Sequence, residues 1–119
     1  MEIPRMKLEP SKKVVFNSPF VKHQAANLRL TNIGNRAIAW THKNTNNRII
    51  SLNPAYGIIQ PNDSVLIEVC CEPFDEPLSG DRLTFEWLTA PFGEAVLNAD
   101  WFRGAGERRR AWLEIEYNV

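Results

Sequence analysis

The stretch Ser64-Val65-Leu66-Ile67-Glu68-Val69-Cys70-Cys71 decides the fold class, because its apolar residues recur with a period of two. The odd-numbered residues from Val65 to Cys71 are all apolar and would share one face of an extended chain. This alternation is typical of a β-strand that buries one side and exposes the other. The same pattern recurs, strongly or weakly, over residues 14–16, 28–30, 38–40, 83–87 and 113–117.

Turn-forming residues separate these stretches. Asn32-Ile33-Gly34-Asn35, Gln60-Pro61-Asn62-Asp63 and Leu78-Ser79-Gly80-Asp81 each combine residues that favour turns. About seven short strands with turns between them predict an all-β antiparallel sandwich. A short helical turn is predicted near residues 95–102, with Val96, Leu97 and Trp101 forming an apolar stripe. Because no repeat or linker interrupts the chain, residues 1–119 are expected to form a single domain.

The charge balance argues against nucleic-acid binding. Lys plus Arg (14) equal Asp plus Glu (14), whereas binding a phosphate polymer needs a positive excess. The halves of the chain differ: residues 1–60 carry nine basic and two acidic residues, and residues 61–119 carry five and twelve. Opposite patches on one subunit would suit head-to-tail association of identical copies. Ordinary solvated faces are the alternative.

Membrane insertion is not expected. The longest apolar run, Ala37 to Trp40, is far shorter than the ~20 residues that cross a bilayer. The adjacent cysteines Cys70 and Cys71 would point to opposite faces of a strand, so a bond between them would be strained. Two thiols without a separated partner favour a reducing compartment, and we expect a cytoplasmic protein.

Catalytic and metal-binding patterns are missing from the sequence, so we expect no enzyme activity, no cofactor and no metal. The two histidines, His23 and His42, are far apart and have no Cys, Asp or Glu at ligand spacing, which favours hydrogen-bonded structural roles. The acidic residues between Glu72 and Asp81 lack the glycine-centred spacing of a calcium loop and are expected to form a solvated loop.

A candidate interface precedes the end of the chain. The consecutive residues Arg108, Arg109 and Arg110 would protect an exposed strand edge or contact a partner. Trp112 alternates out of phase with the apolar residues that follow it. It is therefore either covered by the short helix or exposed at an interface.

Four motifs in order resemble the major sperm protein family of nematodes over residues 8–118. They are Lys13-Val14-Val15-Phe16-Asn17-Ser18-Pro19, Asp81-Arg82-Leu83-Thr84-Phe85-Glu86-Trp87, Trp101-Phe102-Arg103-Gly104 and Ile115-Glu116-Tyr117-Asn118. The resemblance implies an immunoglobulin-like, PapD-like sandwich of seven strands without catalytic activity. It also implies cis peptide bonds before Pro10 and Pro54, where only X–Pro bonds have a low cis cost.

The family resemblance further implies a cytoskeletal protein of the sperm pseudopod that forms homodimers or filaments, or associates with other family members. The loop between Phe74 and Asp81 is shorter than in filament-forming members. Both polymerisation and regulation of filaments are therefore compatible with the sequence.

A second branch of this fold supplies an alternative function. Vesicle-associated-membrane-protein-associated proteins bind short acidic peptides that carry phenylalanines, in a basic groove. Lys43, Thr45 and Arg82 fall at positions similar to those of that groove, although Asn44 breaks its pattern. Such a groove would attract an acidic segment and hold it with charge-assisted hydrogen bonds.

Overall fold

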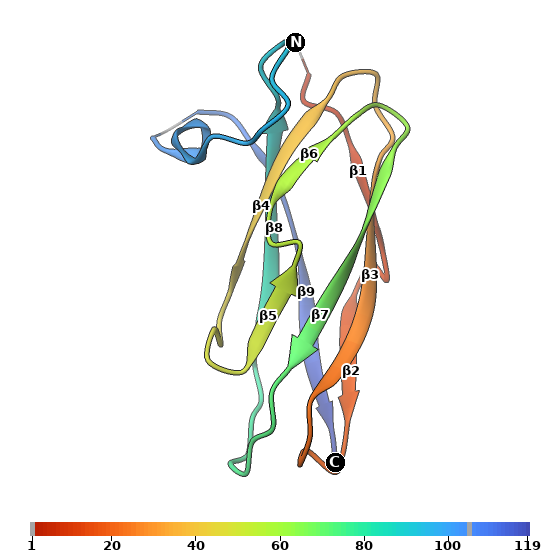
Figure 1. Cartoon of the computed structure of the whole chain (residues 1–119), viewed down its shortest axis with the longest axis vertical. Coiled ribbons are helices and arrows are strands. Elements are labelled where there is room, and N and C mark those ends of the chain that lie inside the picture. The colour runs from red at the N-terminus through yellow and green to blue at the C-terminus, as the bar shows by residue number, and fades with distance from the viewer. Residues whose placement is uncertain (1, 105) are drawn as a thin grey trace.

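Two β-sheets pack face to face in the computed structural model, which describes residues 2–104 and 106–119 (Figure 1). One sheet has the strand order β1-β3-β7-β5 and the other has the order β2-β9-β8-β4-β6. The strands are β1 (Met6–Glu9), β2 (Lys13–Asn17), β3 (Gln24–Asn32), β4 (Ile38–Asn44), β5 (Ile50–Asn53), β6 (Gly57–Ile59), β7 (Ser64–Cys71), β8 (Arg82–Thr89) and β9 (Arg109–Asn118). This is the immunoglobulin-like sandwich predicted from the sequence.

Two strands divide between the sheets, so the predicted seven strands become nine segments. β1 pairs with β3 in one sheet, and β2, directly after it, pairs with β9 in the other. In the same way β5 pairs with β7, and β6 pairs with β4. Pro10 and Pro54 lie at these two crossings, each after a cis peptide bond, and Ser18–Pro19 is cis as well.

The pairing of β2 with β9 is parallel, unlike every other strand pair of the described chain. Its register runs from Lys13 opposite Glu114 to Asn17 opposite Asn118. The chain leaves β3 after β1, crosses to the other sheet and continues as β2. There β2 runs in the same direction as β9. The antiparallel prediction holds for the rest of the sandwich.

The core lies between the sheets and contains the residues that the alternation placed inward. Phe16, Trp40 and Phe85 are among its largest buried side chains, and the rings of Trp40 and Phe85 lie 5.9 Å apart. The polar side chain of Asn32 is also buried. Its amide donates to the carbonyls of Arg36 (2.8 Å) and Ile59 (3.0 Å), so its hydrogen-bonding groups are satisfied.

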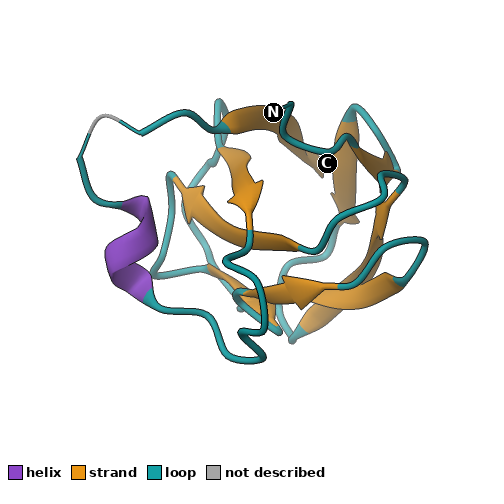
Figure 2. Ribbon diagram, turned by 90° about the horizontal axis from the view of Figure 1, so that it is seen from above, coloured by secondary structure: helices purple, strands orange, loops and turns teal. Residues whose placement is uncertain are grey.

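The helical turn predicted near residues 95–102 is present but shorter than predicted. Within residues 95–102 only Ala99–Phe102 form a helix, the 3₁₀ helix η1, which Asn98 caps by accepting from the amide of Asp100. No residue of η1 is buried, and Val96, which the predicted stripe included, lies outside η1 and is 76% exposed. Figure 2 shows η1 to one side of the two sheets. A single turn of helix presents too little surface to pack as a layer.

Candidate interaction surface

The outer face of the five-stranded sheet carries most of the residues that the sequence singled out. Across this face Trp112 of β9 lies opposite Thr84 of β8, and Thr84 lies opposite Lys43 of β4. Arg110 lies opposite Glu86 in the neighbouring row. Because side chains alternate along a strand, these residues point away from the core that their neighbours fill.

Glu86 is the acidic residue with which three basic side chains at this face form ion pairs. Its side chain is almost fully buried, and its carboxylate meets Lys43 at 3.0 Å, Arg108 at 3.2 Å and Arg110 at 3.5 Å. Burial acts to raise the pKa of the Glu86 carboxyl, but hydrogen bonds from Lys43 and Arg108 and the charge of Arg110 outweigh it and lower the pKa. One carboxylate faces three cations, so the local charge remains positive.

An exposed aromatic ring adjoins these charges. Trp112 is 60% exposed, and the guanidinium of Arg82 lies 5.7 Å from the centre of its ring, within the range of a cation–π contact. Of the two outcomes left open by the sequence, Trp112 is therefore exposed and not covered by the helix. We call Lys43, Arg82, Arg110 and Trp112 the basic face.

The predicted groove residues lie together, but they differ in whether their polar side-chain atoms can still bind a ligand. The amide of Arg82 donates to the Thr45 hydroxyl (2.9 Å), and that hydroxyl donates to Asp81 (2.9 Å). The hydroxyl proton of Thr45 is thus used within the chain. Lys43 is 74% exposed although it pairs with Glu86, and it keeps donors for a ligand.

The three consecutive arginines have different roles. Arg108 is largely buried and donates to the carbonyls of Phe102 (2.8 Å) and Gly104 (3.1 Å) besides Glu86. Arg109 donates to the carbonyl of Ile3 (2.8 Å) and so holds the N-terminal segment. Only Arg110 of the three has a mostly exposed side chain. β2 pairs with β9 from Glu114 onward, so residues 109–113 lack a strand partner on that side within the described chain.

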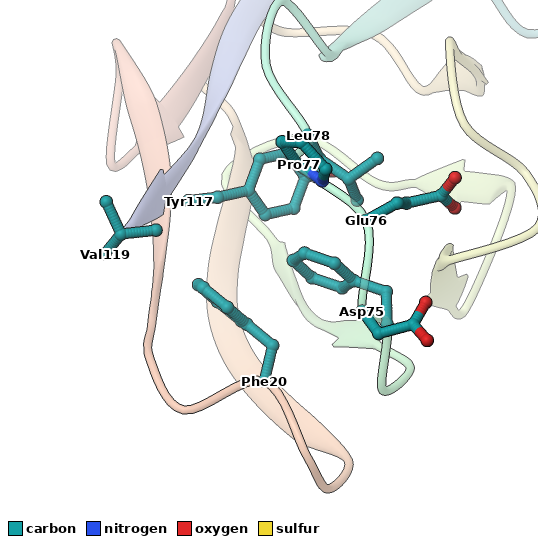
Figure 3. Close-up of a pocket in the computed structure, with 8 residues that line it drawn as sticks. Phe20, Asp75, Glu76, Pro77, Leu78, Tyr117 and Val119 are labelled. Atoms are coloured by element: carbon teal, nitrogen blue, oxygen red, sulfur yellow. The ribbon is translucent and has the colours of Figure 1, made fainter.

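An apolar hollow of about 430 Å³ is lined by Phe20, Phe74, Tyr117 and Val119, among others (Figure 3). The C-terminal end of the chain, which contributes Val119, lies at the opposite end of the sandwich from η1 (Figure 1). The rings of Phe20 and Phe74 stack at 4.5 Å, and Tyr117 meets Phe74 edge-on at 5.3 Å. The Tyr117 hydroxyl donates to Asp81 at 2.7 Å. Burial, followed by the Asp81 carboxylate, raises the pKa of Tyr117.

Asp81 is more than a residue of a solvated acidic loop, which corrects the sequence interpretation. It accepts hydrogen bonds from Thr45, Asn46 and Tyr117 and so joins the segment after β4 to the end of β9. These donors are remote from Asp81 along the chain, and no local sequence pattern predicts them. Glu76, in the same loop, pairs with Arg48.

The ring of His42 is held by contacts within the chain. His42 is held by a hydrogen bond between its Nδ1 and the carbonyl of Ala55 (2.8 Å), and its ring lies 6.4 Å from that of Phe85. A carbonyl only accepts, so Nδ1 carries the proton in this bond.

Within residues 2–104 and 106–119, no helix has the length and apolar character needed to cross a bilayer.

The strand order and the two strands that divide between sheets define the class of protein as an immunoglobulin-like, PapD-like sandwich. PapD-like domain 7 of human CEP192 superposes with a TM-score of 0.63 at 11% identity, covering 98% of this chain and 87% of that chain. The structure of SSP-19, an MSP-domain protein like family member of Caenorhabditis elegans, superposes with a TM-score of 0.71 at 19% identity, covering 92% and 97%.

Sequence similarity then identifies the family. Residues 5–105 match the model of the MSP (major sperm protein) domain. Major sperm protein isoform alpha of Ascaris suum is 41% identical over 115 residues, which cover 93% of this chain and 91% of that protein. The chain belongs to the major sperm protein domain family, as the motifs in its sequence predicted, and its relatives support a function of the major sperm protein type.

Proposed function

We propose that this protein is a non-enzymatic cytoskeletal protein that self-associates and takes part in, or regulates, filament assembly for amoeboid sperm motility. It would act as a single-domain unit in the cytoplasm of the sperm pseudopod, with copies of itself or other family members as partners. The observation that carries the proposal is the similarity to major sperm proteins over more than nine-tenths of the chain.

The outer surface of the five-stranded sheet supports this role. Among the described residues no strand pairs with residues 109–113 of β9 on the side of β2, and the exposed ring of Trp112 lies on the same segment. An open edge can pair with another chain, and an exposed tryptophan is typical of protein interfaces. Arg110 adds a positive charge that would attract an acidic surface of a second copy.

Sedimentation velocity across protein concentration and salt tests the proposal. We expect oligomers that grow with protein concentration and that Trp112→Ala weakens at least tenfold. Val21→Ala, which changes another exposed apolar residue outside the sheet, is the control and should leave association unchanged. A protein that stays monomeric at all concentrations, and that does not join filaments of other family members, would refute self-assembly.

The basic face favours a second candidate function, the capture of short acidic peptides that contain phenylalanine. The two positive charges of Lys43 and Arg110 exceed the single negative charge of Glu86. The guanidinium of Arg82 lies over the exposed ring of Trp112. A carboxylate-rich segment could therefore gain charge-assisted hydrogen bonds while its aromatic side chain contacts Trp112.

Titration with an acidic phenylalanine-containing peptide tests this second function. Lys43→Ala and Arg82→Ala should each weaken binding about fivefold, by the ~1 kcal/mol that a charged contact at a partly exposed site contributes. Lys7→Ala, which removes an exposed lysine from the other sheet, is the matched control. Equal affinities for all three variants would exclude the basic face as the binding site.

A further inference from the structure

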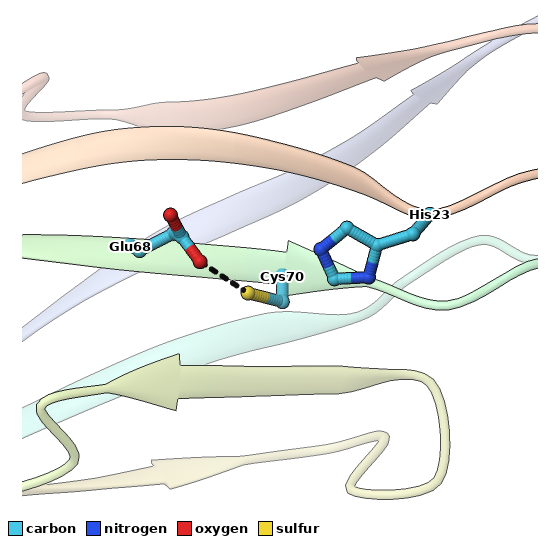
Figure 4. Close-up of side chains that lie close together, drawn as sticks. All are labelled: His23, Glu68 and Cys70. Carbon is cyan, nitrogen blue, oxygen red and sulfur yellow. Dashed lines mark hydrogen bonds between the residues drawn. The ribbon is translucent and has the colours of Figure 1, made fainter.

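Nitrogen, sulfur and oxygen donors converge on the outer face of the four-stranded sheet, away from the surface described above. His23 directly precedes β3, while Glu68 and Cys70 lie two residues apart on β7. One ligand atom from each of the three side chains lies within 4.8 Å of the others. Figure 4 shows the Cys70 sulfur between the Glu68 carboxylate and the His23 imidazole.

The sequence predicted no metal site because these residues are distant along the chain. The pairing of β3 with β7 sets Gln24 opposite Cys71, which brings His23 to the end of β7. Cys70 and Cys71 point to opposite faces as predicted: Cys71 joins the core cluster, while the Cys70 thiol donates to Glu68 on the outer face at 3.2 Å.

A second carboxylate sets the direction of the histidine ring. His23 Nδ1 lies 3.2 Å from Oε1 of Glu72. A carboxylate only accepts, so Nδ1 carries the proton in this bond and Nε2 is the ring nitrogen left for a metal ion. In Figure 4 one ring nitrogen of His23 is turned toward Cys70 and Glu68. Metal-bound histidines almost always donate their other N–H to such a partner, which orients the ring.

The charges around the site favour a cation. Glu68 forms no ion pair with any lysine or arginine of the described residues, and Glu72 pairs only with His23 there. Arg29, the nearest arginine on this face by strand register, lies opposite Leu66 and donates to the Ser64 hydroxyl at 3.3 Å. Two carboxylates and a thiol therefore lie together without an ion pair to a lysine or arginine of the described residues. Imidazole, thiolate and carboxylate are the donors that Zn²⁺ prefers, whereas Ca²⁺ and Mg²⁺ select oxygen alone.

We propose that His23, Glu68 and Cys70 bind a divalent transition-metal ion of the Zn²⁺ class. Nε2 of His23, one carboxylate oxygen of Glu68 and the Cys70 sulfur supply three ligands, and water fills the fourth position. Cys70 binds as the thiolate, so its proton is released to solvent when the metal binds. Glu72 is a positioning residue that holds the His23 ring through Nδ1.

Cobalt titration of the full chain, with a phosphine reductant present, tests the site. Co²⁺ reports its own coordination: a thiolate ligand gives a near-ultraviolet charge-transfer band, and tetrahedral geometry gives strong visible bands. We expect one Co²⁺ per chain with both features, and loss of both when Zn²⁺ is added. His23→Gln and Glu68→Gln should each weaken binding at least tenfold, and Glu72→Gln about tenfold. The matched control Glu116→Gln, on the other sheet, should bind as the unaltered chain does.

Several results would overturn the proposal. A cobalt spectrum without the thiolate band, a band that persists in Cys70→Ser, or equal affinity in His23→Gln would each exclude the assigned ligands. Cys70 is buried, and its substitution could unfold the chain. The exposed residue His23 avoids that risk, so His23→Gln keeps the test decisive, with circular dichroism to verify its fold.

Discussion

Replacing Glu86 by glutamine is expected to destabilise the protein strongly, because it removes the carboxylate that three cations share. The side chains of Lys43 and Arg110 are mostly exposed, and losing their pairings costs at most ~1 kcal/mol each. Arg108 is only 10% exposed and would lose its buried partner while keeping its carbonyl contacts. Loss of a charged hydrogen bond there costs about 2 kcal/mol.

In total, Glu86→Gln should lower the free energy of unfolding by about 3 kcal/mol at pH 7, as measured by urea denaturation. For a domain of this length it corresponds to a melting temperature lower by about 10 °C. Glu116→Gln is the matched control, because Glu116 forms an exposed pair with Lys13 at 3.2 Å. That variant should lose less than ~1 kcal/mol.

The pH dependence gives an independent check. Folding lowers the pKa of the Glu86 carboxyl below its ordinary value of 4.5. The stabilisation from the ionised carboxylate is therefore fully present above about pH 4.5 and disappears as the pH falls through the lowered pKa. The difference in stability between the unaltered protein and Glu86→Gln should shrink accordingly. A Glu86→Gln variant within ~0.5 kcal/mol of the original protein at pH 7, or a difference that does not change with pH, would refute this reasoning.

Three further predictions concern the core and its margins. Gly34→Ala would place a Cβ 2.4 Å from Cβ of Pro4, so it should lower the unfolding free energy by about 1 to 3 kcal/mol; an unchanged urea midpoint would contradict the close packing. Burial, followed by a nearby carboxylate, raises the pKa of the Cys71 thiol to about 11, so iodoacetamide at pH 8 should label Cys71 only after unfolding, as read by tandem mass spectrometry. Rapid labelling of the folded protein would argue against that burial. Tyr117→Phe removes a 2.7 Å hydrogen bond to Asp81 and should cost about 1 to 2 kcal/mol in thermal unfolding, whereas a stabilised variant would show that the bond contributes nothing.

The elements of the fold were predictable because their signals are local. Alternation placed Val14, Phe16, Leu83 and Phe85 on the inner faces, and all are buried. The helical prediction was less accurate, because an apolar stripe such as that near Val96 forms a packed helix only when another layer covers it. Here the segment lies beside the sandwich, and only four residues form a helical turn.

The sequence by itself determined which segments are strands, which side of each strand is buried, and which family the chain resembles, since these depend on neighbouring residues. Only the tertiary structure decided which distant side chains meet. It placed Glu86 between three cations from two distant segments, gave Asp81 three donors, and brought His23 to Glu68 and Cys70. Strand pairing between remote segments fixes these contacts, and neither composition nor spacing along one strand specifies which remote segments will pair.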